Sequence, residues 1–173
     1  MKKFFVSTLL LFSIFACAQT PNQPLEVVKS IELQRFLGKW YEIGGIPTPE
    51  QANCTGTTAT YTAKSATEVD VLNRCFEKSL TGKEISAKGR AYIPNPAEPT
   101  KLKVEFFWPF AGDYQIMALD PEYQYAMIGT PSRRYLWVLS RSPELPESTW
   151  KTLVDTAVAQ GYDSSKIIKT LQK

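Results

Sequence analysis

Eight short segments of this 173-residue chain have the composition of β-strands, and turn-forming residues separate them at a spacing of about 10 to 15 residues. In the clearest segment, residues 101–108, the apolar Leu102, Val104 and Phe106 alternate with Lys103 and Glu105. The other seven segments are residues 39–46, 56–63, 68–75, 86–93, 113–120, 123–130 and 134–141. Many short strands joined by short turns favour an all-β fold, either a closed up-and-down barrel or a sandwich.

Two helical segments flank the strands. A short helical turn is expected within residues 30–38, with Ser30 as its N-cap. A longer helix is expected near the C-terminus, where apolar residues recur at helical spacing from Leu153 to Val158, and a last short strand is possible at residues 166–171. Because the one long helix follows all the strands, the order favours the closed barrel, which leaves no free sheet edge.

The first residues have the features of a secretory leader. Two lysines precede an apolar run over residues 4–15, which is too short to span a bilayer as a helix. Residues 14–17, Ile-Phe-Ala-Cys, resemble the cleavage box of bacterial lipoproteins, which predicts a lipidated (palmitate-bearing) Cys17. Cleavage after Ala18 by the ordinary signal peptidase, giving a secreted or periplasmic protein, is the alternative.

These signals divide the chain into a signal peptide over residues 1–16, a polar tether over residues 17–30 and one domain over residues 31–173. The residue after the cysteine is alanine and not aspartate, which by resemblance to enteric sorting rules predicts an outer-membrane lipoprotein anchored by its acyl chains. Removing the two leader lysines from a net charge of +3 leaves about +1, so a nucleic-acid partner is not expected.

The three cysteines and the lack of histidine limit the chemistry. Without histidine, Ser-His-Asp and Cys-His catalysis are excluded, and two cysteines alone do not complete a zinc site, so no catalytic, metal or cofactor site is expected. With Cys17 lipidated, Cys54 and Cys75 remain as a pair in an oxidising compartment. If a turn at residues 64–67 joins the second and third strands, opposing residues have numbers that add to about 129, as those of Cys54 and Cys75 do. A disulfide is therefore expected, with two buried free thiols as the alternative.

Three short motifs resemble the signatures of the lipocalin family. They are Gly-Lys-Trp-Tyr with Gly38 and Trp40, the segment around Asp120, and Leu-Ser-Arg-Ser-Pro with Arg141. Among lipocalins, the chain looks most like the bacterial outer-membrane lipoproteins and apolipoprotein D. The resemblance implies an eight-stranded antiparallel barrel closed at one end by a short helix, with Trp40 at the closed end and Arg141 stacked on its ring.

Alternation along the strands predicts which side chains face the interior. If Arg141 points inward, so do alternate residues before it, and their neighbours across the sheet follow, Ala118 among them. The predicted ligand-binding set is Val69, Val71, Leu102, Val104, Phe106, Tyr114, Ile116, Ala126, Ile128, Tyr135, Trp137 and Leu139. The set is apolar and aromatic, and Glu42 is the one charged residue that the alternation can add. A filled barrel would use the same residues, whereas the resemblance favours a hollow one.

The resulting hypothesis is a binding protein for a small hydrophobic or amphiphilic ligand, a fatty acid or lysophospholipid, held at the bacterial outer membrane with a role in envelope lipid maintenance. The alternatives are a lipocalin-type lipid-modifying enzyme and a structural envelope lipoprotein with a filled barrel, and a homodimer is left open. Arg133, Arg134 and Lys101 are candidates for the rim of the mouth. Gly44 and Gly45 are expected at the mouth as well, so that a large residue at Gly44 would weaken ligand binding more than stability.

Overall fold

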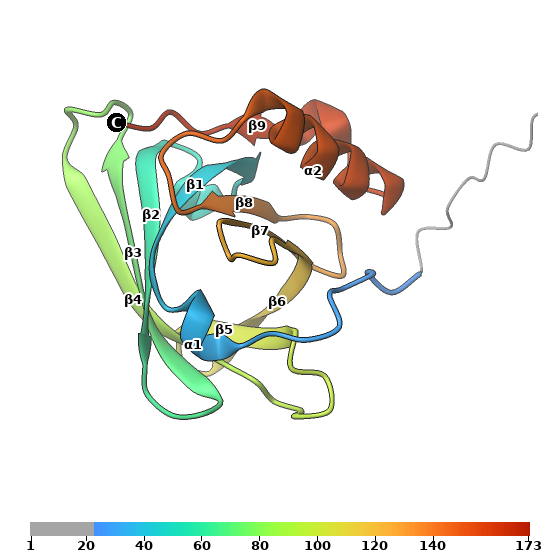
Figure 1. Cartoon of the computed structure of the whole chain (residues 1–173). Helices are drawn as coiled ribbons and strands as arrows, with labels where there is room; N and C mark the ends of the chain where they lie inside the picture. Colours follow the sequence, from blue (N-terminus) through green and yellow to red (C-terminus); the bar gives the residue numbers. More distant parts are fainter. Residues whose placement is uncertain (1–22) are drawn as a thin grey trace, which may run out of the picture.

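Eight antiparallel strands pair in sequence order, and the first also pairs with the eighth, so the sheet closes into an up-and-down barrel (Figure 1). The computed structural model describes residues 23–173, so the predicted signal peptide and Cys17 lie outside the described residues. The strands are β1 (Gly38–Ile46), β2 (Cys54–Ala63), β3 (Glu68–Glu77), β4 (Glu84–Tyr92), β5 (Lys101–Phe107), β6 (Phe110–Leu119), β7 (Tyr125–Gly129) and β8 (Leu136–Ser140). The predicted barrel is confirmed.

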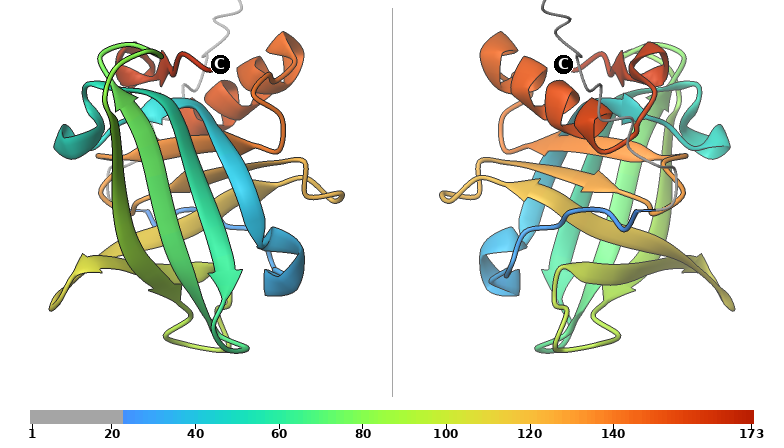
Figure 2. Two further views of the ribbon diagram at one scale, coloured as in Figure 1. Left: turned by 90° about the vertical axis from the view of Figure 1, so that its left-hand side faces the viewer. Right: turned by 90° about the vertical axis from the view of Figure 1, so that its right-hand side faces the viewer.

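The helices lie outside the barrel wall. The α1 turn (Leu33–Phe36) lies at one end of the barrel and α2 (Glu147–Ala159) lies along its side (Figures 1 and 2). Shorter elements are η1 (Pro49–Gln51), η2 (Ser164–Lys166) and β9 (Ile168–Lys169). None of the helices in residues 23–173 has the length and apolar character that crossing a bilayer requires.

The N-cap of α1 differs from the prediction. Glu32, and not Ser30, precedes the first helical residue, in an extended conformation and with no side-chain cap. The chain leaves the helix through Leu37, and Gly38 follows with φ of 89°, a left-handed conformation that glycine adopts without steric cost. The turn is held by its packing, because Phe36 is buried.

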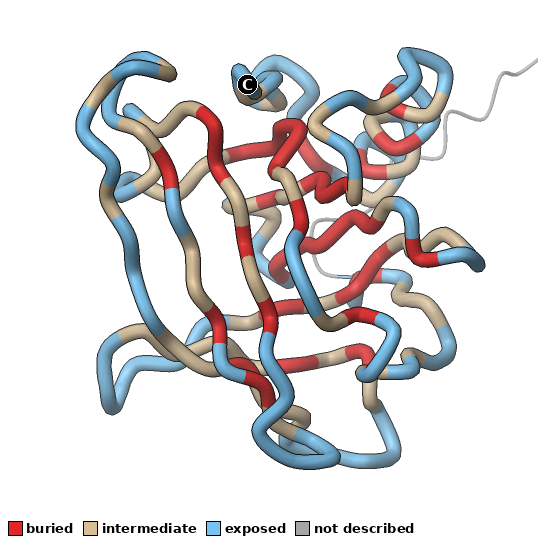
Figure 3. Tube along the Cα trace, turned by 60° about the vertical axis from the view of Figure 1, so that its left-hand side comes forward, coloured by how far each residue is buried: buried red, intermediate tan, exposed pale blue. Residues whose placement is uncertain are grey.

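Two apolar clusters stabilise the barrel. One fills its interior around Trp40, and the other lies between the outer face of the barrel and α2, where Trp150, Leu153 and Ala157 cover Met127 and Val138. Figure 3 shows buried stretches along the strands and exposed loops at their ends. The barrel therefore has an interior that can hold a site and a second core outside the wall.

The turn between β5 and β6 lies earlier than predicted. The predicted strand segments 101–108 and 113–120 leave the turn at residues 109–112, but Phe107 pairs with Phe110, and Trp108 and Pro109 form the turn. Proline suits a turn position, where no ladder hydrogen bond is lost. As a result, β6 begins at Phe110 and three large aromatic side chains lie at the tip of this hairpin.

Bulges shift the register in four of the strand pairs, and two of them change the side-chain directions predicted from alternation. A register shift between Ile116 and Ala118 makes Ala118 the partner of Met127, so Ala118 packs in the outer cluster and not in the interior as predicted. A second shift lies between Glu42 and Gly44 in β1. Strict alternation holds between such points and fails across them.

The second bulge overturns the expectation for the paired glycines of β1. A Cβ atom on Gly44 would lie 2.3 Å from the backbone oxygen of Ile168 and 2.7 Å from Cη2 of Trp150, which belong to β9 and α2. Gly45 has φ of 147°, and a Cβ there would lie 1.9 Å from the oxygen of Leu136. Gly44 therefore allows close packing on the outer face and does not widen the mouth.

The disulfide between Cys54 and Cys75 is confirmed, with Cα atoms 5.4 Å apart. The predicted register was wrong, because opposing residues such as Tyr61 and Val71 have numbers that add to 132. A shift between Thr55 and Thr58 then places Cys54 opposite Glu77, so the bridge joins diagonal neighbours. The disulfide links the start of β2 to the end of β3.

The C-terminal segment completes the wall where β1 and β2 separate. Their direct pairing ends at Tyr41 and Thr58, and beyond that point the backbone of the last residues bridges the two strands. Thr170 N–H donates to the carbonyl of Ile43 at 2.9 Å, and the carbonyl of Leu171 accepts from Gly56 N–H at 2.6 Å. This segment therefore brings polar side chains to the upper wall of the barrel.

Candidate functional site

The closed end of the barrel is built around Trp40. Its side chain has no exposed surface, its Nε1–H donates to the carbonyl of Phe36 at 2.8 Å, and its ring lies 3.8 Å from the guanidinium carbon of Arg141. A guanidinium over an indole face is a favourable cation–π pair. The structure brings Trp40 and Arg141 together as the resemblance implied, beneath the interior and not at an opening.

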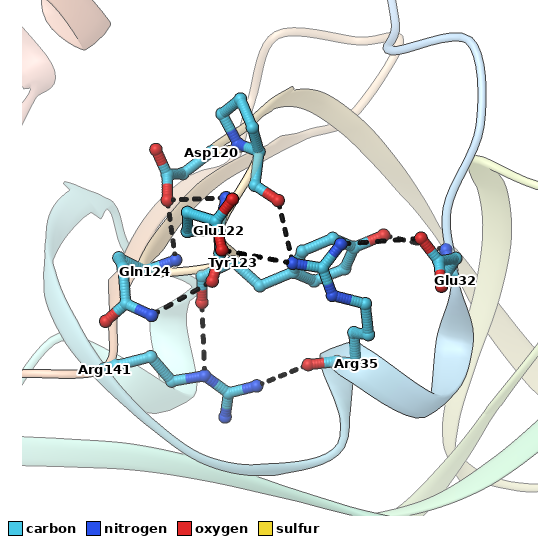
Figure 4. A network of polar contacts seen from close by, with 8 residues as sticks. Glu32, Arg35, Asp120, Glu122, Tyr123, Gln124 and Arg141 are labelled. Carbon is cyan, nitrogen blue, oxygen red and sulfur yellow. Dashed lines mark hydrogen bonds and ion pairs between the residues drawn. The ribbon is translucent and has the colours of Figure 1, made fainter.

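Hydrogen bonds fix the guanidinium of Arg141 against three segments, and Figure 4 shows the bonds to Arg35 and Tyr123. It donates to the carbonyls of Lys39 at 2.9 Å, Arg35 at 2.8 Å and Tyr123 at 3.3 Å. In the β6–β7 turn, Oδ2 of Asp120 accepts from the backbone N–H groups of residues 122 and 124, both at 3.1 Å. The three signature motifs therefore meet in one polar network that closes this end.

Above this floor the barrel contains a cavity of about 620 Å³. Seven of the twelve residues predicted to bind ligand line it: Val71, Val104, Phe106, Tyr114, Tyr135, Trp137 and Leu139. The remaining five pack deeper, in the interior cluster that contains Trp40: Val69, Leu102, Ile116, Ala126 and Ile128. The volume lies within the range of about 300 to 1,000 Å³ that is usual for small-molecule sites. The barrel is thus partly filled at its base and hollow above, which argues against the filled-barrel alternative.

Two tyrosine hydroxyls face each other low in the cavity. Tyr61 and Tyr114 are hydrogen-bonded at 2.9 Å between their hydroxyl oxygens, and both line the cavity. Burial raises the pKa of Tyr61 to about 12 and raises the pKa of Tyr114 well above its ordinary value. Both phenols are therefore neutral at physiological pH, and one hydroxyl donates to the other.

A polar group on the upper wall centres on Glu42, which is buried. Its Oε2 accepts from Nε2 of Gln51 at 3.0 Å, and its Oε1 accepts from Oγ1 of Thr170 at 3.0 Å. Oε1 of Gln51 in turn accepts from Nε1 of Trp137 at 3.0 Å. Burial raises the pKa of Glu42 to about 7, although both hydrogen bonds oppose that shift. The wall therefore contains a carboxyl group whose charge depends on pH near neutrality.

The strand pattern did not identify several of these wall residues. Tyr61 lies opposite Val71, so a correct hairpin register would have placed it inside. Gln51 and Thr170 lie outside the barrel strands, in η1 and in the C-terminal segment, where no alternation exists to interpret. Only long-range contacts bring them to Glu42.

The three cations proposed for the rim lie in different places. Lys101 begins β5 at the closed end, where it is paired with Glu98, so that expectation was wrong. Arg133 lies in the β7–β8 loop, but its Nε donates to the carbonyl of Gln160 at 3.1 Å on the outer side. Arg134 is exposed in the same loop, and its guanidinium carbon lies 5.6 Å from the ring centroid of Tyr135. Within residues 23–173 no three Cys, Asp or Glu side chains gather in a way that could hold a metal ion.

The amino-acid sequence is similar to a family model and to several known proteins. Residues 31–172 match a family model described as a lipocalin-like domain. The chain is 42% identical over 162 residues to temperature-induced lipocalin-1 of Arabidopsis thaliana, covering 88% of this chain and 86% of that protein. It is 34% identical over 158 residues to the outer membrane lipoprotein Blc of Escherichia coli K12, covering 91% and 89%.

Animal proteins are similar as well. Apolipoprotein D of Mus musculus is 33% identical over 168 residues, covering 91% of this chain and 85% of that protein. Among solved structures, insecticyanin from the tobacco hornworm Manduca sexta superposes with a TM-score of 0.67 at 21% identity, covering 87% and 86% of the two chains. The last similarity concerns the fold alone.

Proposed function

Because this chain belongs to the lipocalin family, we propose that it binds a single-chain amphiphile, a fatty acid or a lysophospholipid, inside the barrel. The observation that carries the proposal is the cavity of about 620 Å³ with its mainly apolar and aromatic wall. An acyl chain entering it would gain about 0.8 kcal/mol for each buried methylene group. The polar end of the ligand would remain near the mouth.

We propose binding without catalysis. An enzyme acting on lipid through a thiol needs a free cysteine, and Cys54 and Cys75 are joined in a disulfide. Both tyrosines at the base are neutral phenols, so they offer no phenolate as base or nucleophile at neutral pH. The enzyme alternative would regain support if purified protein converted a bound lipid into a product detected by mass spectrometry.

We also propose that lipid on Cys17 anchors the protein at the outer membrane. The lipoprotein-like box in the leader supports this, as does the similarity to a protein named an outer membrane lipoprotein. Cells grown with radiolabelled palmitate should incorporate label into the parent protein and not into a Cys17→Ser variant. Label in both forms, or in neither, would favour the secreted or periplasmic alternative.

A tryptophan at Gly112 should block the cavity. Gly112 lines the cavity from β6, and a Cβ there would meet only Val104, with Cγ1 at 3.7 Å and the backbone oxygen at 3.9 Å. The larger side chain would fill part of the cavity that the ligand occupies. Gly112→Trp is therefore expected to weaken binding about tenfold or more, which corresponds to a loss of about 1.4 kcal/mol in binding free energy. The measurement is titration with the neutral fluorescent probe N-phenyl-1-naphthylamine and its displacement by lauric acid or lysophosphatidylethanolamine.

Gly44→Ala is the matched control for this experiment. Its Cβ would collide with the backbone of Ile168 on the outer face, so it is expected to lower the free energy of unfolding by about 1 to 3 kcal/mol and leave probe affinity unchanged. Gly112→Trp should show the reverse, with a free energy of unfolding within about 1 kcal/mol of the parent. A folded Gly112→Trp protein with parental affinity would contradict the proposed function.

A further inference from the structure

Three adjacent large aromatic side chains are exposed at the tip of the β5–β6 hairpin. The exposed fractions are 76% for Phe107, 82% for Trp108 and 77% for Phe110. The other large exposed apolar residues, such as Val158, lie elsewhere in the fold. Single exposed apolar residues are normal on soluble proteins, whereas a contiguous group of rings marks an interaction surface.

The hairpin tip lies at the mouth of the cavity. Phe107 and Phe110 are among the residues that line the cavity, and the hairpin, yellow-green in Figure 2, projects away from the barrel wall. The apolar surface of the cavity therefore continues onto the exposed side chains of the tip. A surface that covered the tip would also cover the route into the cavity.

The loops between strands differ in net charge at the two ends of the barrel. The four loops at the open end are residues 47–53, 78–83, 108–109 and 130–135, and their net charge is +3. The three loops between strands at the closed end are residues 64–67, 93–100 and 120–124, and their net charge is −2. An anionic surface would therefore attract the loops around the mouth.

We propose that the open end of the barrel docks on an anionic phospholipid surface, with Phe107, Trp108 and Phe110 inserted between the headgroups. Phenylalanine and tryptophan are favoured at this depth, where the ring is buried and the indole N–H stays hydrated. The exposed Lys78, Lys83 and Arg134 in the loops around the mouth add attraction to the lipid phosphates. This contact is separate from any acyl anchor at Cys17, and it presents the cavity to the layer that holds its ligand.

Quenching of Trp108 by vesicles tests the contact in the full-length chain without added ligand. The vesicles contain phosphatidylethanolamine and phosphatidylglycerol, with bromine on the acyl chains as the quencher. Of the four tryptophans, Trp40 and Trp150 are buried, and Trp137 lines the cavity and would report acyl chains bound there. All proteins therefore carry Trp137→Phe, which leaves Trp108 as the exposed reporter, and no tryptophan precedes Trp40, so the leader gives no signal of its own. The expected result is a blue shift with quenching that weakens at high salt and with phosphatidylcholine vesicles.

Two variants distinguish insertion of the hairpin tip from non-specific binding of the protein to vesicles. Phe107→Ser with Phe110→Ser keeps Trp108 as the reporter and is expected to reduce its quenching at least about threefold, because most of the inserted area is lost. Val158→Ser removes an exposed apolar residue from α2 and should leave the quenching unchanged. Equal quenching in the parent and the double variant would overturn the proposal.

A second copy of the chain is the competing occupant of this surface. If the parent sediments as a dimer, the double variant sediments as a monomer and vesicles give no quenching, the tip is a contact between copies and the lipid proposal is wrong. The proposed function is tested apart from this, because probe binding is measured without vesicles. Probe binding with no quenching of Trp108 would refute the docking alone.

Discussion

Replacing Trp40 with alanine is expected to lower the free energy of unfolding by about 3 to 5 kcal/mol, the cost usual for a large buried aromatic side chain. The ring is fully buried, and its centroid lies 4.7 Å from that of Phe36. Its loss leaves a hole beneath the guanidinium of Arg141 and removes the donor to the carbonyl of Phe36. Both losses fall at the place where the three signature motifs meet.

Urea denaturation followed by far-ultraviolet circular dichroism measures this effect, because tryptophan fluorescence changes with the mutation itself. Trp108→Ala makes the same chemical change at a side chain that is 82% exposed, so its expected cost is within about 0.5 kcal/mol. Trp40 is not among the residues that line the cavity, so folded Trp40→Ala protein should retain most of its probe affinity. Similar losses in both variants would show that the closed end contributes little to stability.

Much of the barrel could be predicted because its signals are local. Alternation of apolar residues marks strands wherever one face is buried, and the turns between them are short. The pairing of β7 with β8 agrees with the same pattern, since Ile128 lies opposite Trp137 and Ala126 opposite Leu139, and all four belong to the predicted inward-facing set. The family signatures added the stacking of Arg141 on Trp40, which no local pattern contains.

Features that depend on bulges and on distant segments could not be predicted in this way. A bulge adds one residue without a clear compositional mark, and the direction of Gly44 depends on one. Likewise, Glu42 was visible as a strand residue, but its partners come from residue 51 and residue 170. The charge state of the cavity wall is therefore a property of the fold and not of any short stretch of sequence.

The buried carboxyl of Glu42 is expected to make the protein less stable as pH rises from about 4.5 to about 7. Burial raises its pKa from 4.5 to about 7 in the folded state, whereas the unfolded chain has the ordinary value. Within that window the unfolded chain has lost the proton and the folded protein retains it, so the free energy of unfolding falls as pH rises. The change levels off above the folded pKa, and at 1.36 kcal/mol per unit it amounts to roughly 3 kcal/mol.

Glu42→Gln should remove this dependence. A glutamine is neutral at every pH and can still exchange hydrogen bonds with Gln51 and Thr170, so the variant is expected to match the parent near pH 4 and to exceed its stability near pH 8 by roughly 3 kcal/mol. Urea denaturation at several pH values between these limits gives the two slopes. Glu98→Gln, at an exposed ion pair with Lys101, serves as the control and should keep the parental slope in that window. Parallel slopes for the parent and Glu42→Gln would mean that the carboxyl is ionised inside the folded barrel, and that Gln51 and Thr170 stabilise its charge well enough to offset burial.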